Sequence, residues 1–165
     1  MSSLGAAVIT CSNRSAAGER ADDSGALLAD LLLQAGCTIA SRTVVPDDIE
    51  EIRSAVRSAV SLGARVVITT GGTGLAPTDV TPEAVRALLD REVPGVAEAV
   101  RLAARDRVPT SVLSRGVAGT VGDAFVVTLP GSPGGVRDGM AVLAPLLRHV
   151  ADQLAGADHR AGGGV

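Results

Sequence analysis

A glycine-rich turn followed by a single carboxylate is the segment best suited to chemistry. Three glycines occur in Gly71-Gly72-Thr73-Gly74 directly after an apolar run, and Asp79 follows in the same loop. Glycines after a buried strand let backbone N–H groups turn towards an anion without interference from Cβ. The segment lacks the GK[ST] ending of a P-loop and the spacing of a dinucleotide fingerprint. On spacing alone, a phosphate-binding loop and a tight turn without a ligand stay equally open.

The position of Asp79 favours ligand binding over helix capping. Thr81 and Pro82 already offer an N-cap and a proline at the first helical position. A carboxylate beside an anion-binding turn repels phosphate unless a divalent cation lies between them. We therefore expect Asp79 to bind Mg²⁺ or substrate, with a solvated loop aspartate as the alternative.

Other acidic residues have a capping role as their simplest interpretation. Asp47 and Asp48 follow Pro46, and their spacings to glutamates three residues later resemble a capping box. Because one residue alone can be the cap, one of the two aspartates is left over. The residues by themselves favour capping for this pair. Asp22, Asp23 or Ser24 is expected to cap, in the same way, the helix that begins at this segment.

A second glycine turn and two arginines complete the candidates. The segment 129–135, LPGSPGG, combines a strand end with a turn that either binds a polar ligand or only reverses the chain. Arg101 and Arg115 could reach an anion, although composition alone favours solvated arginines. Cys11 is expected to be a buried strand residue, and neither His149 nor His159 forms a Ser-His or Cys-His pattern. The chemistry that remains as a candidate is phosphoryl transfer that relies on a metal ion or on the alignment of the reactants.

Short apolar runs alternate with helical patterns and predict the elements that hold these residues. The predicted strands are Gly5–Cys11, Thr38–Val45, Arg65–Thr70 and Ala124–Leu129, the last preceded by a partner strand in a hairpin-like pair. The predicted helices span 24–35, 47–62, 81–92, 94–107 and 136–155, with Gly36 and Gly63 as stops after the first two. Pro145 is expected to break or kink the last helix.

This alternation predicts an α/β fold with a mostly parallel sheet covered on both faces. In such sheets, ligands bind beyond the carboxyl ends of the strands. The loops 11–25, 69–82 and 129–135 each follow a strand and are expected to open on one edge.

The whole chain limits the possible partners. A chain of 165 residues with 46% hydrophobic residues fits one domain, and the tail after residue 156 is expected to be frayed. A net charge of −3 and a single aromatic residue disfavour nucleic acid. All 15 basic residues are arginine, which excludes Schiff-base lysines. No signal peptide or membrane span is visible, and two cysteines suggest a reducing compartment, so we expect a cytoplasmic protein without membrane contact.

Together the loops resemble the molybdenum-cofactor biosynthesis domain family, specifically its stand-alone molybdopterin adenylyltransferases. The resemblance runs from about residue 6 to 154 and rests on DDSG, VVPDD, TTGGTGLAPTDVTPEA, PGVAEAVR, SVLSRGVAG and LPGSPGG. It implies a three-layer α/β/α sandwich over residues 1–156 with a flexible tail at 157–165. It also implies a homotrimer that uses ATP and Mg²⁺ to adenylate molybdopterin, with pyrophosphate as product. A transient contact with the molybdate-inserting enzyme follows from the same likeness.

The resemblance also assigns site residues. Asp47 and Asp79 match the two acidic positions that face the family's site, as catalytic residues and Mg²⁺ ligands, which reverses the capping preference for Asp47 and leaves Asp48 as the dispensable one. The implied substrate-binding residues are Thr70, Gly71, Gly72, Thr73, Gly74, Gly131, Ser132, Pro133, Ser24 and Arg115.

Two departures and two alternatives accompany the resemblance. Gly134-Gly135 stands where the family often has a basic or larger residue, which implies weaker or rearranged pterin contacts, and the arm before Asp79 lacks the arginine of some members. The alternatives are a non-catalytic molybdopterin-binding paralogue and a competence-damage-type nucleotide pyrophosphatase. The glycine-rich end at Val165 implies that no second domain of the competence-damage type follows, and the presence of both aspartates favours catalysis.

Overall fold

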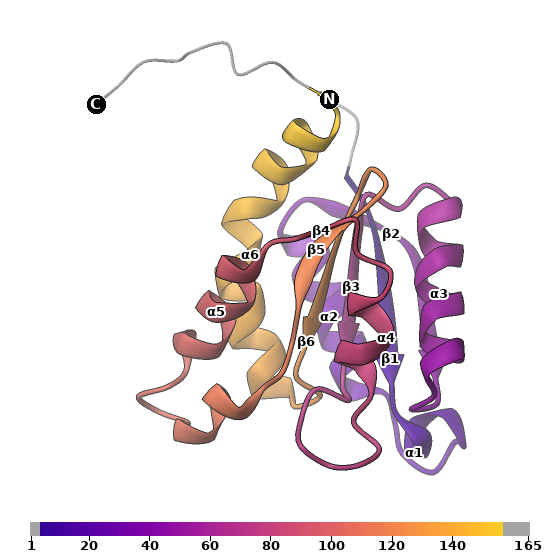
Figure 1. Cartoon of the computed structure of the whole chain (residues 1–165), viewed down its shortest axis with the longest axis vertical. Helices are drawn as coiled ribbons and strands as arrows, with labels where there is room; N and C mark the ends of the chain where they lie inside the picture. Colours follow the sequence, from indigo (N-terminus) through magenta and orange to yellow (C-terminus); the bar gives the residue numbers. More distant parts are fainter. Residues whose placement is uncertain (1–3, 157–165) are drawn as a thin grey trace.

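The structure, a computed structural model, describes residues 4–156, so the predicted tail at 157–165, including His159, lies outside the described residues. Six strands form one sheet: β1 (Leu4–Cys11), β2 (Cys37–Val45), β3 (Val66–Thr70), β4 (Arg91–Glu92), β5 (Ala118–Val121) and β6 (Ala124–Leu129). The helices are α1 (Asn13–Ala16), α2 (Asp23–Gln34), α3 (Ile49–Ser61), α4 (Thr81–Arg86), α5 (Pro94–Ala103), the 3₁₀ helix η1 (Pro109–Leu113) and α6 (Pro133–Leu154). Figure 1 shows their arrangement.

The sheet is mostly parallel, as predicted. Its order is β2-β1-β3-β6-β5-β4, in which β1 pairs in parallel with β2 and β3, and β3 pairs in parallel with β6. The hairpin β5–β6 and the short edge strand β4 add the antiparallel part. The carboxyl ends of β1, β2, β3 and β6 therefore meet at one edge.

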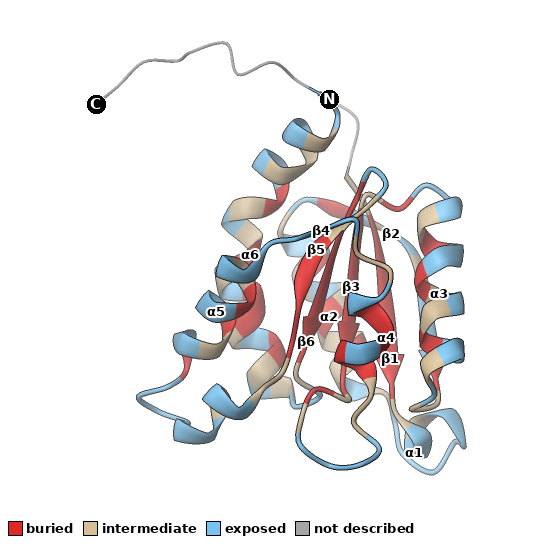
Figure 2. Ribbon diagram, viewed as in Figure 1, coloured by how far each residue is buried: buried red, intermediate tan, exposed pale blue. Residues whose placement is uncertain are grey.

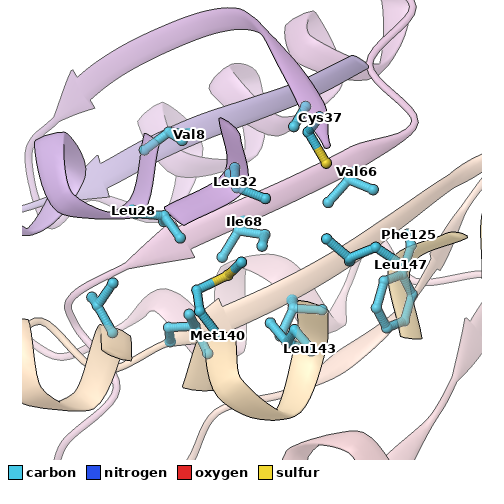
Figure 3. Packing of buried hydrophobic residues seen from close by; sticks show 14 of the residues in the cluster. Val8, Leu28, Leu32, Cys37, Val66, Ile68, Phe125, Met140, Leu143 and Leu147 are labelled. Carbon is cyan, nitrogen blue, oxygen red and sulfur yellow. The ribbon is translucent and has the colours of Figure 1, made fainter. Parts of the chain in front are cut away.

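Alternating side chains of the central strands build two apolar layers. Val8, Val66 and Ile68 face one layer, which α2 and α6 cover with residues such as Leu28 and Leu143 (Figure 3). The neighbouring strand residues face the second layer, where α3 and α4 contribute Ile52, Val56, Ala84 and Val85. The central strands β1, β3 and β6 are buried on both faces, and α2, α3, α5 and α6 are each buried along one stripe (Figure 2). The three-layer prediction is confirmed.

Helix ends follow the predicted signals in most places. Asp22 caps α2 by accepting from the Gly25 N–H at 3.0 Å, and Asp48 caps α3 by accepting from Glu50 and Glu51. Gly36 and Gly63 follow the last turns of α2 and α3 with positive φ, as predicted. Asp48 is thus the capping member of its pair, and Asp47 is the residue left over.

Two local predictions were wrong, and one of the two effects predicted for Pro145, a break in the helix, does not occur. Thr81 is the first residue of α4 and makes no capping bond; Val80 precedes it at the N-cap. The helix ends at Arg86 instead of reaching residue 92, because the chain turns there to pair Arg91 and Glu92 with β5. Pro145 does not break α6, which runs to Leu154. Burial of the apolar face of α6 offsets the local cost of the proline, about 3 kcal/mol in a helix interior.

Candidate active site

The loops after β1, β2, β3 and β6 are joined to one another at the carboxyl edge of the sheet, the lower edge in Figure 1. Thr70 donates its hydroxyl to the Pro130 carbonyl at 2.8 Å, and the Gly71 N–H bonds the Leu129 carbonyl at 3.0 Å. Ser24 donates its hydroxyl to the Gly131 carbonyl. The expectation that these loops open on the same edge is confirmed, and residues more than 100 positions apart in the sequence meet there.

Gly72 occupies a position that excludes any other side chain. Its φ of +67° is left-handed, and a Cβ there would lie 2.3 Å from Thr81 Oγ1 and 3.2 Å from Asp47 Oδ1. The neighbouring Gly71 has φ +100°, and its Cβ would lie 2.3 Å from the Cys11 carbonyl oxygen. The glycine turn is therefore required both by backbone conformation and by the close approach of polar groups from three elements.

Asp47 is held in place by Asn13 and keeps one oxygen without a partner. Its Oδ2 accepts from the Asn13 N–H at 3.0 Å, and its own N–H donates to Asn13 Oδ1 at 2.8 Å. Its Oδ1 is buried and accepts no hydrogen bond within residues 4–156. Buried polar atoms are rarely left unpaired, so an exception at a loop edge suggests a missing ligand or ion. The sequence analysis did not select Asn13; its place just after β1 was the available signal.

Two further polar groups lie beside Asp47. The Thr81 hydroxyl is fully buried and has no hydrogen-bond partner in the described part of the chain. The buried Cys11 thiol is close enough to be affected by both residues. Its pKa is raised to about 12 by burial, with a smaller lowering by the Thr81 hydroxyl and a further increase from the Asp47 charge. Cys11 is thus protonated and buried, in agreement with its predicted role as a strand residue.

Asp79 lies at the opening of the site and also closes its own loop. Its Oδ2 accepts from the Ala76 N–H at 3.0 Å, and its N–H donates to the Ala76 carbonyl at 2.9 Å. A loop-closing bond of this kind was not among the roles that the sequence suggested for Asp79. Its Oδ1 accepts no hydrogen bond from residues 4–156, and the side chain is half-buried. The carboxylate therefore keeps one oxygen available to a ligand.

Several predicted substrate-binding residues hold loops together in this structure. Thr70 is buried, Thr73 lies against Ser114, and Ser132 caps α6 by accepting from the Gly135 N–H, with Pro133 as the first helical residue. Arg115 binds loop carbonyls and Glu83 instead of projecting into solvent. Whether these residues also touch a substrate stays a prediction.

Two cavities share the wall formed by these loops. The larger, about 530 Å³, lies between the glycine turn, α5, η1 and the start of α6 and includes Arg101, Arg107 and Asp138. The smaller, about 330 Å³, lies between β1, the α2 start and Asp47. Gly72, Asp79, Gly131 and Ser132 line both. Arg101 is not simply solvated, since it donates to the Gly116 carbonyl at 3.0 Å. Such a site can hold two ligands whose reactive ends meet at the shared wall.

Two carboxylates that line the smaller cavity suit a magnesium ion, although the chain alone does not enclose one. Among residues 4–156 there is no group of three or more His, Cys, Asp or Glu side chains that could hold a metal. Mg²⁺ is usually bound through one or two carboxylates together with substrate phosphates and water. The unpartnered Asp47 Oδ1 and the available oxygen of Asp79 match this donor set.

The family model described as "Probable molybdopterin binding domain" matches residues 7–149, most of the chain. The chain belongs to this family. The chain is 43% identical over 154 residues to the molybdenum cofactor biosynthesis bifunctional protein of Synechococcus elongatus. That match covers 93% of this chain and 48% of the relative, so the chain spans about half the length of that protein.

Shorter relatives match over nearly their whole length. The molybdopterin adenylyltransferase of Pyrococcus furiosus is 36% identical, with 87% of this chain and 86% of the relative covered. The molybdopterin biosynthesis Mog protein of Mycobacterium ulcerans superposes with a TM-score of 0.87 at 45% identity, covering 92% of this chain and 99% of that one. The CinA protein of Thermoplasma acidophilum shares the fold at 21% identity and a TM-score of 0.65, covering 90% and 98%.

Within residues 4–156, no helix is both long and apolar enough to cross a membrane.

Proposed function

We propose that this chain adenylates molybdopterin with ATP, as a step of molybdenum cofactor biosynthesis. One observation carries the proposal: two cavities share a wall that bears the carboxylate of Asp79, with the unpartnered oxygen of Asp47 beside it. An adenylyl transfer needs two substrates held end to end, one in each compartment. The relative from Pyrococcus furiosus, named a molybdopterin adenylyltransferase, supports this reaction class.

The reaction forms one bond and breaks one bond at the α-phosphorus of ATP. An oxygen of the terminal phosphate of molybdopterin attacks the α-phosphorus, and the bond to the bridging oxygen of the β-phosphate breaks. Pyrophosphate leaves with that electron pair. The attacking phosphate is already an anion, so no general base is needed. This agrees with cavity walls that carry no histidine among the described residues and with a chain that has no lysine.

The chain's own residues would act by positioning and by donating hydrogen bonds. The backbone N–H groups of Gly72, Thr73 and Gly74 and of the α6 start can bind phosphate oxygens, and α6 adds the positive end of its dipole. Asp47, fixed by Asn13, and Asp79 would hold Mg²⁺, which neutralises phosphate charge when bound. Precise alignment of the two reactants is the main source of rate in such a site.

Three further statements belong to this proposal. We expect a homotrimer and a transient contact with the enzyme that inserts molybdate, both from the family resemblance. A cytoplasmic location is supported by two cysteines that are both buried and unpaired. The domain is expected to extend over residues 1–156.

A direct assay tests the proposed function. Purified protein, molybdopterin, ATP and Mg²⁺ are incubated, and the adenylated pterin and pyrophosphate are quantified after chromatography. Adenylated pterin in a one-to-one ratio with pyrophosphate is the expected result. Pterin binding without adenylate would show a non-catalytic binding paralogue. Pyrophosphate release that does not require the pterin would show a nucleotide pyrophosphatase, and either outcome would reject the proposal.

A further inference from the structure

One guanidinium group bonds both ends of the loop that carries Asp79. Arg115 donates from Nε to the Gly74 carbonyl at 2.8 Å and from Nη2 to the Asp79 carbonyl at 2.7 Å. Its Nη1 donates to the carboxylate of Glu83 in the first turn of α4. Its backbone N–H also bonds the Thr73 carbonyl at 2.8 Å. Arg115 therefore joins the glycine turn, the end of the loop and the next helix.

The loop between these two bonded ends extends from the protein. Residues 75–78 are all exposed, and Leu75 keeps 68% of its surface accessible. The loop is visible between β3 and α4 at the lower edge of Figure 1. Inside the loop, the two bonds between Ala76 and Asp79 close a short turn. Arg115 thus bonds both ends of the loop that carries the Asp79 side chain to the shared wall.

The charge of Arg115 is already balanced inside the protein. Its side chain is 34% exposed, and all three guanidinium nitrogens donate to protein acceptors. The hydrogen bond from Arg115 lowers the pKa of Glu83, so that carboxylate is ionised beside it near neutral pH. Two of its five N–H donors are not used in these bonds, but Arg115 lines neither of the two cavities, as an arginine that binds a substrate anion would. A planar group with donors in a fixed fork suits the fixing of two carbonyls, which an ammonium group cannot reproduce.

We propose that Arg115 is a positioning residue that fixes the 74–79 loop and so places the Asp79 carboxylate, instead of binding substrate itself. The effect on catalysis rests on the proposed function. The effect on the loop does not rest on the proposed function, because the bonds from Arg115 to the loop carbonyls are made in the ligand-free protein.

Amide hydrogen exchange in the ligand-free protein tests the loop directly. The variants are Arg115→Gln, Arg115→Lys and Glu83→Gln, and the amides followed by NMR are those of Ala76 and Asp79. The control is Arg53→Lys on α3, which also removes an arginine paired with a glutamate and bonded to a carbonyl of α4. Neither glutamine nor lysine can bond both loop carbonyls as the guanidinium does, so at least one charge-assisted bond to the loop is lost in each Arg115 variant, and exchange should accelerate about tenfold or more. The control should leave these amides unchanged, and Glu83→Gln should give a smaller increase.

Steady-state kinetics of the same variants separate positioning from substrate contact. Positioning predicts that kcat falls about tenfold or more in both Arg115 variants while KM for each substrate changes less than about threefold. A direct anion contact predicts unchanged exchange, a raised KM, and partial rescue by lysine.

The outcomes distinguish the two proposals. Unchanged exchange at Ala76 and Asp79 in both Arg115 variants would overturn the inference, even if the wild type is active. Faster exchange with an inactive wild type would reject the adenylation and leave the loop inference standing. If Arg115→Gln does not fold, Arg115→Lys and Glu83→Gln carry the same test.

Discussion

Gly72→Ala is the substitution whose effect the structure specifies most fully. It combines an unfavourable left-handed backbone, φ +67°, with a Cβ that would lie 2.3 Å from Thr81 Oγ1. Gly63→Ala is the matched control, because Gly63 also has a positive φ, +91°, but nothing lies within 4 Å of its Cβ position. The difference between the two variants therefore measures the crowding at the site separately from the backbone cost.

The magnitude follows from two contributions. An alanine in the left-handed region costs about 1–2 kcal/mol, which is the whole expected loss of unfolding free energy for Gly63→Ala. Crowding of a packed site adds about 1–3 kcal/mol, so Gly72→Ala should lose about 2–5 kcal/mol. For a domain of this size each kcal/mol lowers Tm by about 2–4 °C.

Urea unfolding and adenylation, both measured at a temperature where the variants are folded, test this expectation. Gly63→Ala should keep wild-type adenylation. In Gly72→Ala the adenylation rate should fall about tenfold or more, because Thr81 and Asp47 must move to relieve the contact and this disturbs the wall shared by the cavities. Equal losses of stability in the two variants, or a fully active Gly72→Ala protein, would refute the reasoning.

Three further predictions concern the groups around this wall. Asp48→Ala should cost about 0.5–2 kcal/mol of unfolding free energy by removing the α3 cap and should retain adenylation; an inactive but folded variant would contradict this. Asn13→Ala should reduce adenylation with little effect on the urea midpoint, because its side chain orients the Asp47 segment, and unchanged turnover would reject that role. Above pH 9, stability should fall by up to about 1.4 kcal/mol per pH unit per thiol, because burial raises the pKa of Cys11 to about 12 and the unfolded thiol loses its proton first. The chain has no Tyr or Lys, so Cys37 is the other group with a raised pKa in that range, and a slope unchanged by Cys11→Val would contradict the assignment.

The sequence predicts the sheet well, because central strands buried on both faces leave continuous apolar runs. The strand Ala124–Leu129 has the predicted bounds, and the strand ending at Thr70 differs from prediction by one residue. Where a segment is exposed, the pattern is ambiguous. Residues 87–92 keep a helical distribution of side chains, yet pairing with β5 takes Arg91 and Glu92 into the sheet. Tertiary pairing of this kind leaves no local signal.

The site was predictable in its residue types and only partly in their roles. Spacing suggested a functional Asp79, but its bond to the Ala76 N–H depends on how the loop folds back. Asp47 and Asp48 are equivalent capping candidates in sequence. The structure separates them, because Asp48 bonds the first turn of α3 whereas Asp47 bonds Asn13 after β1. Asn13 and Arg115 act through contacts with residues 32 or more positions away, which a single sequence does not show.

A structure of the ternary complex with Mg²⁺, molybdopterin and α,β-methylene ATP tests the central claim most directly. The methylene bridge blocks release of pyrophosphate, so both substrates stay in place. We expect one ligand in each cavity, with the terminal phosphate of the pterin and the α-phosphorus of the nucleotide facing each other beside Gly72 and Asp79. Both ligands competing for one cavity, or reactive phosphates that lie away from this wall, would contradict it.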